Sequence, residues 1–184
     1  MKPLATQTEK RDRAKQAGFS LIELLIVVAI ILIIAAIAIP NLMRAKMAAN
    51  EAAAAFSLRT ITTASVNYFT TYGNGYAPTL GALGGPVGGT ASCNAAMILD
   101  NILSNNGSGN TSTKSGYIFT FSPGASNNAA VAGCGSPGLT SFTLLAAPAL
   151  PSVTGQRCFF TDQTGVIRFT TDGSTPTASS PPIQ

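Results

Sequence analysis

Residues 17–40 read AGFSLIELLIVVAIILIIAAIAIP, an apolar run that contains a single carboxylate. Sixteen residues from Leu24 to Ile39 are apolar without a break, and the five residues before them extend the segment to twenty-one. A helix of that length measures about 31 Å, enough to cross a hydrocarbon core roughly 30 Å thick. We therefore predict a transmembrane helix over residues 19–39. Within it, Glu23 lies where a charge costs roughly 2.5–3.5 kcal/mol on insertion scales.

The charges of the chain are concentrated before this helix. Residues 1–18 hold five of the eleven basic residues and only two acidic ones, whereas Arg44 and Lys46 alone follow closely. The positive-inside rule then predicts a cytoplasmic amino terminus and a carboxyl-terminal region outside. The remaining basic residues form no run with interleaved aromatic residues, so no specific nucleic-acid partner is expected.

A second, more polar helical segment is predicted over residues 40–72. Pro40 removes one backbone donor and is expected to kink or loosen the helix near residues 36–39. GNG at residues 73–75 predicts the end of the helix, because Gly and Asn tolerate a left-handed backbone. Apolar side chains recur along one stripe of this segment: Leu58, Ile61, Tyr68 or Phe69, and Tyr72.

Residues 73–184 are predicted to form a globular β-sheet domain with a flexible tail. Apolar and β-branched residues predict strands near residues 117–121 and 141–146, and a hairpin of residues 157–161 and 166–170. AAMILDNIL, at residues 95–103, is a candidate short helix, and GSGNTSTKSG, at residues 107–116, is interpreted as a flexible loop. The fold class is therefore α+β, with a long helix packed on a small antiparallel sheet.

The junction between the leader and the apolar helix carries a recognisable pattern. Gly18 precedes an apolar residue, Phe19; Glu23 follows four residues later, and an uninterrupted apolar helix then ends at Pro40. This pattern resembles the class III signal of type IV pilins and pseudopilins, over residues 15–46. The resemblance implies a pilin-like fold, with residues 1–18 as a prepilin leader peptide.

The resemblance also implies how the chain is processed and assembled. Prepilin peptidase would cleave between Gly18 and Phe19 and the amine of Phe19 would be methylated. Mature subunits would polymerise through their helices, with Glu23 paired to the amino terminus of a neighbour and the helix loosening before Pro40. Elementary electrostatics favours the same pairing, because cleavage creates an ammonium group at the membrane depth of Glu23. The alternative is that Glu23 reaches the membrane interface by itself.

Three cysteines in a region predicted to lie outside the cytoplasm indicate one disulfide and one remaining thiol. In an antiparallel meander, Cys134 and Cys158 would lie at opposite ends of the sheet. Cys93 precedes a segment that leads back to the first strand, which favours Cys93–Cys134. The resemblance to pilins, which often carry a carboxyl-terminal disulfide loop, instead favours Cys134–Cys158, so both pairings stay open.

The sequence gives no support for an enzyme. It contains no histidine, which excludes histidine-dependent triads and histidine-ligated zinc. No cofactor or metal is expected: Asp162 and Asp172 lack the cluster of oxygen ligands that calcium requires. The chain also lacks a signature like DGWGNP, which is typical of major pseudopilins that bind calcium.

The leading hypothesis is a structural subunit of a type IV pilus-like filament, serving motility, adhesion or DNA uptake. A pseudopilin of type II secretion is the runner-up, and a membrane-tethered adhesion module that does not polymerise is an alternative of another class. An exported soluble protein would instead be cleaved after Ala38. The expected partners are further copies of the chain, prepilin peptidase, the pilus or secretion assembly machinery, and the inner membrane. The expected location is that membrane before assembly, and a surface pilus or periplasmic pseudopilus afterwards.

Overall fold

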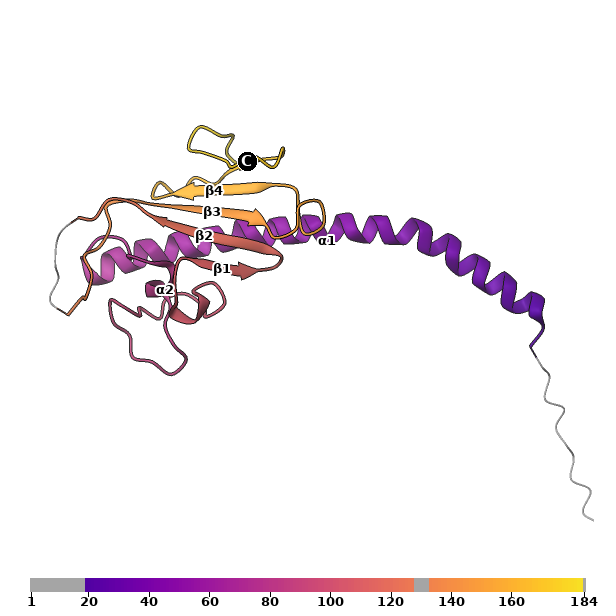
Figure 1. The fold of residues 1–184 in the computed structure, drawn as a ribbon, viewed down its shortest axis with the longest axis horizontal. Helices are drawn as coiled ribbons and strands as arrows, with labels where there is room; N and C mark the ends of the chain where they lie inside the picture. The colour runs from indigo at the N-terminus through magenta and orange to yellow at the C-terminus, as the bar shows by residue number, and fades with distance from the viewer. Residues whose placement is uncertain (1–18, 128–132, 184) are drawn as a thin grey trace, which may run out of the picture. The chain divides into compact units, whose positions relative to one another are not determined.

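The computed structural model describes residues 19–127 and 133–183, and divides the chain into two compact units, Met1–Pro40 and Asn41–Gln184. One long helix, α1 (Leu21–Tyr72), contributes to both units (Figure 1). The second unit adds a short helix α2 (Leu80–Leu83), a 3-10 turn η1 (Asn105–Gly107) and five strands. The strands are β1 (Thr111–Lys114), β2 (Tyr117–Pro123), β3 (Phe142–Pro148), β4 (Cys158–Asp162) and β5 (Arg168–Thr170).

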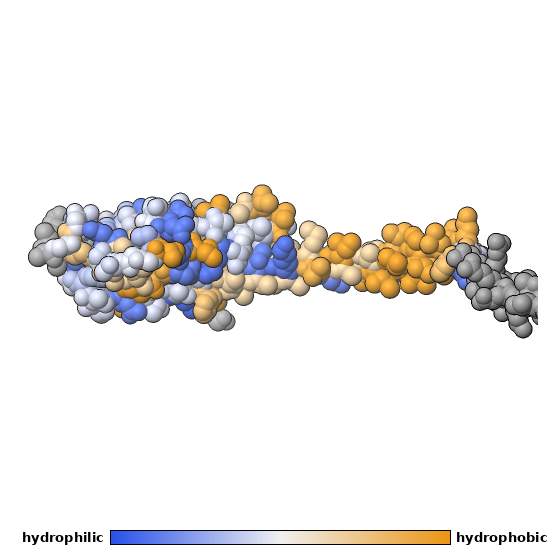
Figure 2. All heavy atoms as spheres, turned by 90° about the horizontal axis from the view of Figure 1, so that it is seen from below, coloured by the Kyte–Doolittle hydropathy of each residue, from blue (hydrophilic) through white to orange (hydrophobic). Residues whose placement is uncertain are grey.

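The described part of the first unit is a helix with no apolar core of its own. Its large apolar side chains, from Phe19 to Ile39, are all exposed. The visible face of this half of α1 is accordingly hydrophobic almost throughout (Figure 2). By length and composition the helix can cross a membrane. Pro40 lies inside α1 and does not end it.

In the second unit, α1 buries one stripe of side chains and leaves the opposite face in solvent. The buried positions recur every three or four residues, as the helical period requires. They are Ala54, Ser57, Leu58, Ile61, Ala64, Ser65 and Tyr68. The sequence left open whether Tyr68 or Phe69 belongs to this stripe. Tyr68 does, since it is 1% exposed, whereas Phe69 is 47% exposed. Gly73 ends the helix with φ +63°, and its N–H donates to the Phe69 carbonyl at 3.0 Å.

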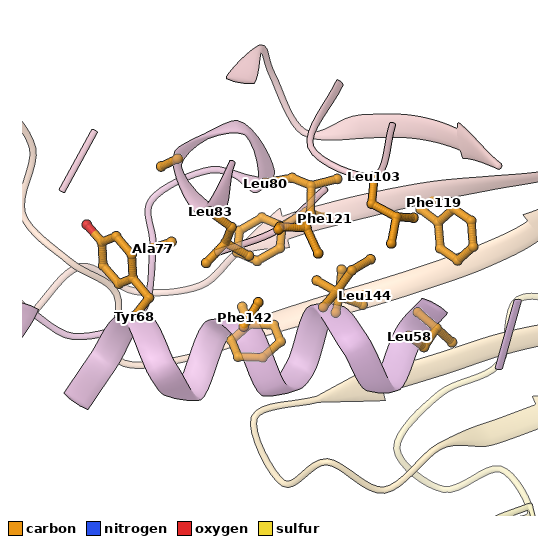
Figure 3. Packing of buried hydrophobic residues seen from close by; sticks show 14 of the residues in the cluster. Leu58, Tyr68, Ala77, Leu80, Leu83, Leu103, Phe119, Phe121, Phe142 and Leu144 are labelled. Atoms are coloured by element: carbon orange, nitrogen blue, oxygen red, sulfur yellow. The ribbon is translucent and has the colours of Figure 1, made fainter. Parts of the chain in front are cut away.

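The five strands form one antiparallel meander in the order β1-β2-β3-β4-β5. Alternate residues of β2 and β3 are buried, which places Tyr117, Phe119 and Phe121 of β2 on the core face together with Phe142 and Leu144 of β3. Figure 3 shows this core, to which α1 contributes Leu58 and Tyr68, and the segment after α1 contributes Leu80 and Leu83. The predicted α+β fold is confirmed: a long helix packs with an antiparallel sheet.

Two local predictions are wrong, for identifiable reasons. Residues 95–103 form no helix, because the N–H groups of residues 96–99 donate to carbonyls of residues 82–84. Within residues 107–116, the segment Thr111–Lys114 is a strand, β1, paired with β2 from Thr111↔Thr120 to Lys114↔Tyr117. Its polar sequence TSTK lacks the apolar alternation that identifies a strand.

The carboxyl-terminal tail is held against the sheet, although the sequence predicts a flexible tail. The N–H of Phe169 donates to the Pro181 carbonyl at 3.0 Å, and the N–H of Ile183 donates to the Ile167 carbonyl at 2.9 Å. Ile183 also packs against the hydrophobic core. The tail thereby covers the edge of the sheet at β5, where unpaired backbone groups would otherwise be exposed.

One carboxylate of α1 fixes the connection between β3 and β4. Glu51 Oε1 accepts the N–H groups of Gln156 and Arg157, at 2.9 and 3.2 Å, and its Oε2 lies 3.0 Å from Arg157 Nε. The side chain of Glu51 is 12% exposed, whereas Gln156 and Arg157 lie at the surface. Beside it, Asn50 Nδ2 donates to the Thr154 carbonyl at 2.9 Å. The two residues together attach the loop to the helix.

Glu51→Ala should therefore lower the free energy of unfolding by about 1–2 kcal/mol, because two backbone donors and a guanidinium lose a charged acceptor. Glu51→Gln keeps an acceptor and should cost about half as much. The measurement is guanidinium unfolding of the full chain in detergent, followed by the fluorescence of the four tyrosines, which all lie in the second unit. Asn67→Ala, an exposed change on α1, serves as the control and should shift stability by less than about 0.5 kcal/mol. Equal effects of Glu51→Ala and Asn67→Ala would contradict the assignment.

Candidate assembly site at the amino terminus

The amino end of α1 brings Ser20 and Glu23 together. The N–H of Ser20 donates to Glu23 Oε2 at 2.9 Å, and the Leu24 N–H donates to the Ser20 carbonyl at 3.2 Å. Ser20 thus occupies the capping position, and Glu23 reaches back to its backbone as in half of a capping box. A carboxylate in the first turn also lies favourably at the positive end of the helix dipole.

The site has room for a second interaction. Oε1 of Glu23 accepts no hydrogen bond from any residue of the described ranges. Phe19 immediately precedes the capped Ser20 and is 81% exposed. The carboxylate therefore lies within one residue of the backbone nitrogen of Phe19. Gly18 and the rest of the expected leader lie outside the described residues.

Sequence reasoning found Glu23 but missed its bond to Ser20. The signal was present, because Ser-x-x-Glu at residues 20–23 has the spacing of a capping box. Pro40, the other expected assembly residue, lies inside α1, seventeen residues beyond Glu23. The structure brings Phe19 and Glu23 to one end of the helix and does not bring Pro40 to them.

The cysteines are distributed as one pair and one thiol. Cys93 and Cys134 form a disulfide with a Cα–Cα distance of 5.5 Å, while Cys158 is free and buried. The pair joins the segment after α2 to the connection between β2 and β3. Burial, and to a smaller extent the charge of Asp172, raises the pKa of the Cys158 thiol, which keeps it protonated and unreactive. The remaining alternative, Cys134–Cys158, is not the pairing found.

The described residues contain no group of three His, Cys, Asp or Glu side chains that could hold a metal ion. Asp162 and Asp172 each organise a turn instead. Asp162 Oδ1 accepts the Thr164 N–H at 2.9 Å, and Asp172 Oδ1 accepts the Ser174 N–H at 3.0 Å. Each carboxylate therefore stabilises a turn of its own segment.

The α+β fold of the chain is pilin-like, and its helix α1 begins with an apolar half that carries the Ser20–Glu23 site at its start. Residues 13–39 match the family model of the prokaryotic N-terminal methylation motif. The chain therefore carries a class III signal of the type IV prepilin kind, and is type IV pilin-like or pseudopilin-like. The motif indicates a structural protein and not an enzyme, and the signal together with the apolar helix is consistent with membrane anchoring. No curated protein matches the chain.

Proposed function

We propose that this chain is a structural subunit of a type IV pilus-like filament. Prepilin peptidase cleaves it between Gly18 and Phe19 and methylates the new amine. The observation that carries the proposal is the amino half of α1. There, large apolar side chains are exposed on every side, and Glu23 is the single ionisable residue between Phe19 and Ile39. Residues 19–39 lie entirely within the matched methylation motif, residues 13–39.

Polymerisation gives both features a physical purpose. Lipid covers the apolar helix while the subunit is in the inner membrane, and the helices of other copies cover it in the filament. Cleavage leaves an ammonium group on Phe19, which methylation does not neutralise. In the apolar filament core, that ammonium and the Glu23 carboxylate of a neighbouring subunit satisfy each other. The carboxylate has Oε1 available for this contact, in addition to the Ser20 bond.

The proposal sets the partners and the location of the chain. The partners are other copies of the chain, the peptidase and the pilus assembly machinery. The chain crosses the inner membrane once, with its amino terminus in the cytoplasm, and then becomes part of a filament at the cell surface. The globular unit carries the surface that meets the surroundings, in motility or adhesion.

Shearing of intact cells separates this function from the alternatives. We expect the chain to be enriched at least tenfold in the sheared fraction relative to an inner-membrane marker protein, because a surface filament breaks off and an anchored protein does not. Chain found only in the envelope would contradict the surface filament. It would favour a type II secretion pseudopilus if Glu23→Gln abolishes crosslinked multimers, and a tethered adhesion module if multimers never form.

A further inference from the structure

Three segments meet at the end of the second unit where α1 enters it. Asn50 Nδ2 donates to the Thr154 carbonyl at 2.9 Å. Gly116, in the turn between β1 and β2, lies against both residues, since a Cβ there would be 2.9 Å from Thr154 Cβ and 3.3 Å from Asn50 Nδ2. In Figure 1 that turn and the connection between β3 and β4 lie at the same end of the sheet. We call this end the base of the second unit; it consists of residues 41–50, 115–116 and 149–155.

The connection between β3 and β4 presents apolar side chains to solvent at the base. Residues 149–155, which we call the 149–155 loop, contain no charged residue. Leu150 is 59% exposed and Val153 is 51% exposed. The Leu150 carbonyl accepts the N–H groups of Val153 and Thr154, at 3.1 and 2.9 Å, so the loop is folded into a tight turn. This turn keeps both apolar side chains at the surface and away from the core.

The first residues of the second unit add apolar and basic side chains to the base. Leu42 is 70% exposed and Met43 is 48% exposed, so the apolar surface of α1 continues beyond the predicted membrane span. Arg44 and Lys46 are exposed, and neither forms an ion pair with a residue of the ranges 19–127 and 133–183. The base therefore combines exposed apolar groups with positive charge that the described chain does not neutralise.

We infer that the base of the second unit docks on the phospholipid surface of the membrane while α1 is inserted. Leu150 and Val153 enter the headgroup layer, and Arg44 and Lys46 meet lipid phosphates. Apolar side chains beside basic ones are typical of segments that lie on a membrane interface. Such a contact can be weak, because the inserted helix already holds the base at a high effective concentration next to the lipid.

The length of α1 brings the 149–155 loop within reach of the bilayer. Seven residues separate Met43 from Asn50, which holds the loop, and they correspond to a rise of about 10 Å. The headgroup layer outside a hydrocarbon core is roughly 5–8 Å thick. A helix tilt of about 20°, the average for transmembrane helices, lowers a group about 10 Å to one side of the axis by roughly 3 Å. The exposed side chains of the loop therefore reach the headgroup layer.

Lipid is the expected occupant because it lies next to the base even when a single chain is inserted. Another copy of the chain would cover the base only at high density or in a filament. The inference thus depends on membrane anchoring by α1 and not on polymerisation, so a failure of filament assembly would leave it standing.

The test places the full chain in lipid nanodiscs, at one chain per disc. The lipids are phosphatidylcholine and anionic phosphatidylglycerol, and part of the phosphatidylcholine carries a nitroxide quencher on its headgroup. The chain has no tryptophan, so Leu150→Trp and Val153→Trp each report on one position of the loop. We expect the nitroxide to quench the fluorescence of each at least three times as strongly as that of the control.

Val87→Trp is the matched control, since Val87 is an apolar residue of the same unit that is 83% exposed and lies outside the base. Replacing both Arg44 and Lys46 with glutamine should lower the quenching of Leu150→Trp at least twofold, because the attraction to anionic lipid is lost.

Three results would each overturn the inference. The first is quenching of both loop reporters no stronger than that of Val87→Trp. The second is quenching that does not change when both basic residues are replaced. The third is a blue shift of the loop reporters that appears only in vesicles crowded with chains, which would assign the base to a second copy.

Discussion

Glu23→Gln is expected to reduce sheared surface filaments at least tenfold, while the amount of chain in the membrane fraction stays unchanged. The substitution removes the charge that we propose as the partner of a neighbour's Phe19 ammonium. Two unit charges 4 Å apart attract by about 4 kcal/mol at an effective dielectric constant of 20. Loss of that attraction would lower the association constant of each subunit about a thousandfold. The net effect is smaller, because a carboxylate costs more to desolvate than an uncharged glutamine side chain.

Glutamine is chosen because it separates the charge from the cap. The carboxylate also accepts the Ser20 N–H, and a glutamine oxygen can keep that bond. A role limited to capping therefore predicts normal assembly of Glu23→Gln and defective assembly of Glu23→Ala. Asp172→Asn, which removes an exposed carboxylate of the second unit, is the control and should assemble normally. Normal filament yield from Glu23→Gln would contradict the proposed pairing.

The second large effect is expected from the disulfide. Replacing both Cys93 and Cys134 with serine should lower the free energy of unfolding by about 4 kcal/mol, the chain-entropy value for a closed loop of this length. The sequence separation is 41 residues. The bridge also holds a segment that packs on the helix, since Tyr68 Oη donates to the Cys93 carbonyl at 2.8 Å. A loss of this size is a large part of the 5–15 kcal/mol typical of a domain.

Cys158→Ala is the control for the double variant. It removes one buried sulfur without opening a loop, and should cost about 1 kcal/mol. The same tyrosine unfolding experiment measures both. A larger loss in Cys158→Ala than in the double variant would contradict the pairing, as would a peptide map in which Cys134 is joined to Cys158.

The helix and four of the five strands could be predicted, because each has a recognisable pattern in the local sequence. The apolar run, the three-to-four spacing of Leu58 and Ile61, and the glycine after Tyr72 specify α1 without any distant partner. β2 and β3 alternate buried and exposed residues, which the sequence shows directly. By contrast, β1 is polar, and it is a strand because it pairs with β2. Residues 96–99 are apolar enough for a helix, but their backbone groups are used by residues 82–84.

The same distinction applies to the functional residues. Glu23 is conspicuous in the sequence because a carboxylate is out of place in an apolar run. Glu51 is not, because its partners Gln156 and Arg157 lie more than a hundred residues away.

Processing at Gly18 is the central claim, since it creates the amine on which the proposed pairing depends. Mass spectrometry of the amino-terminal peptide of the chain isolated from its native membrane or filaments tests it most directly. The account predicts a chain that begins at Phe19 and carries one methyl group on its amine, an addition of about 14 Da. A chain that still begins at Met1, or one that begins at Ile39 after cleavage behind Ala38, would contradict it.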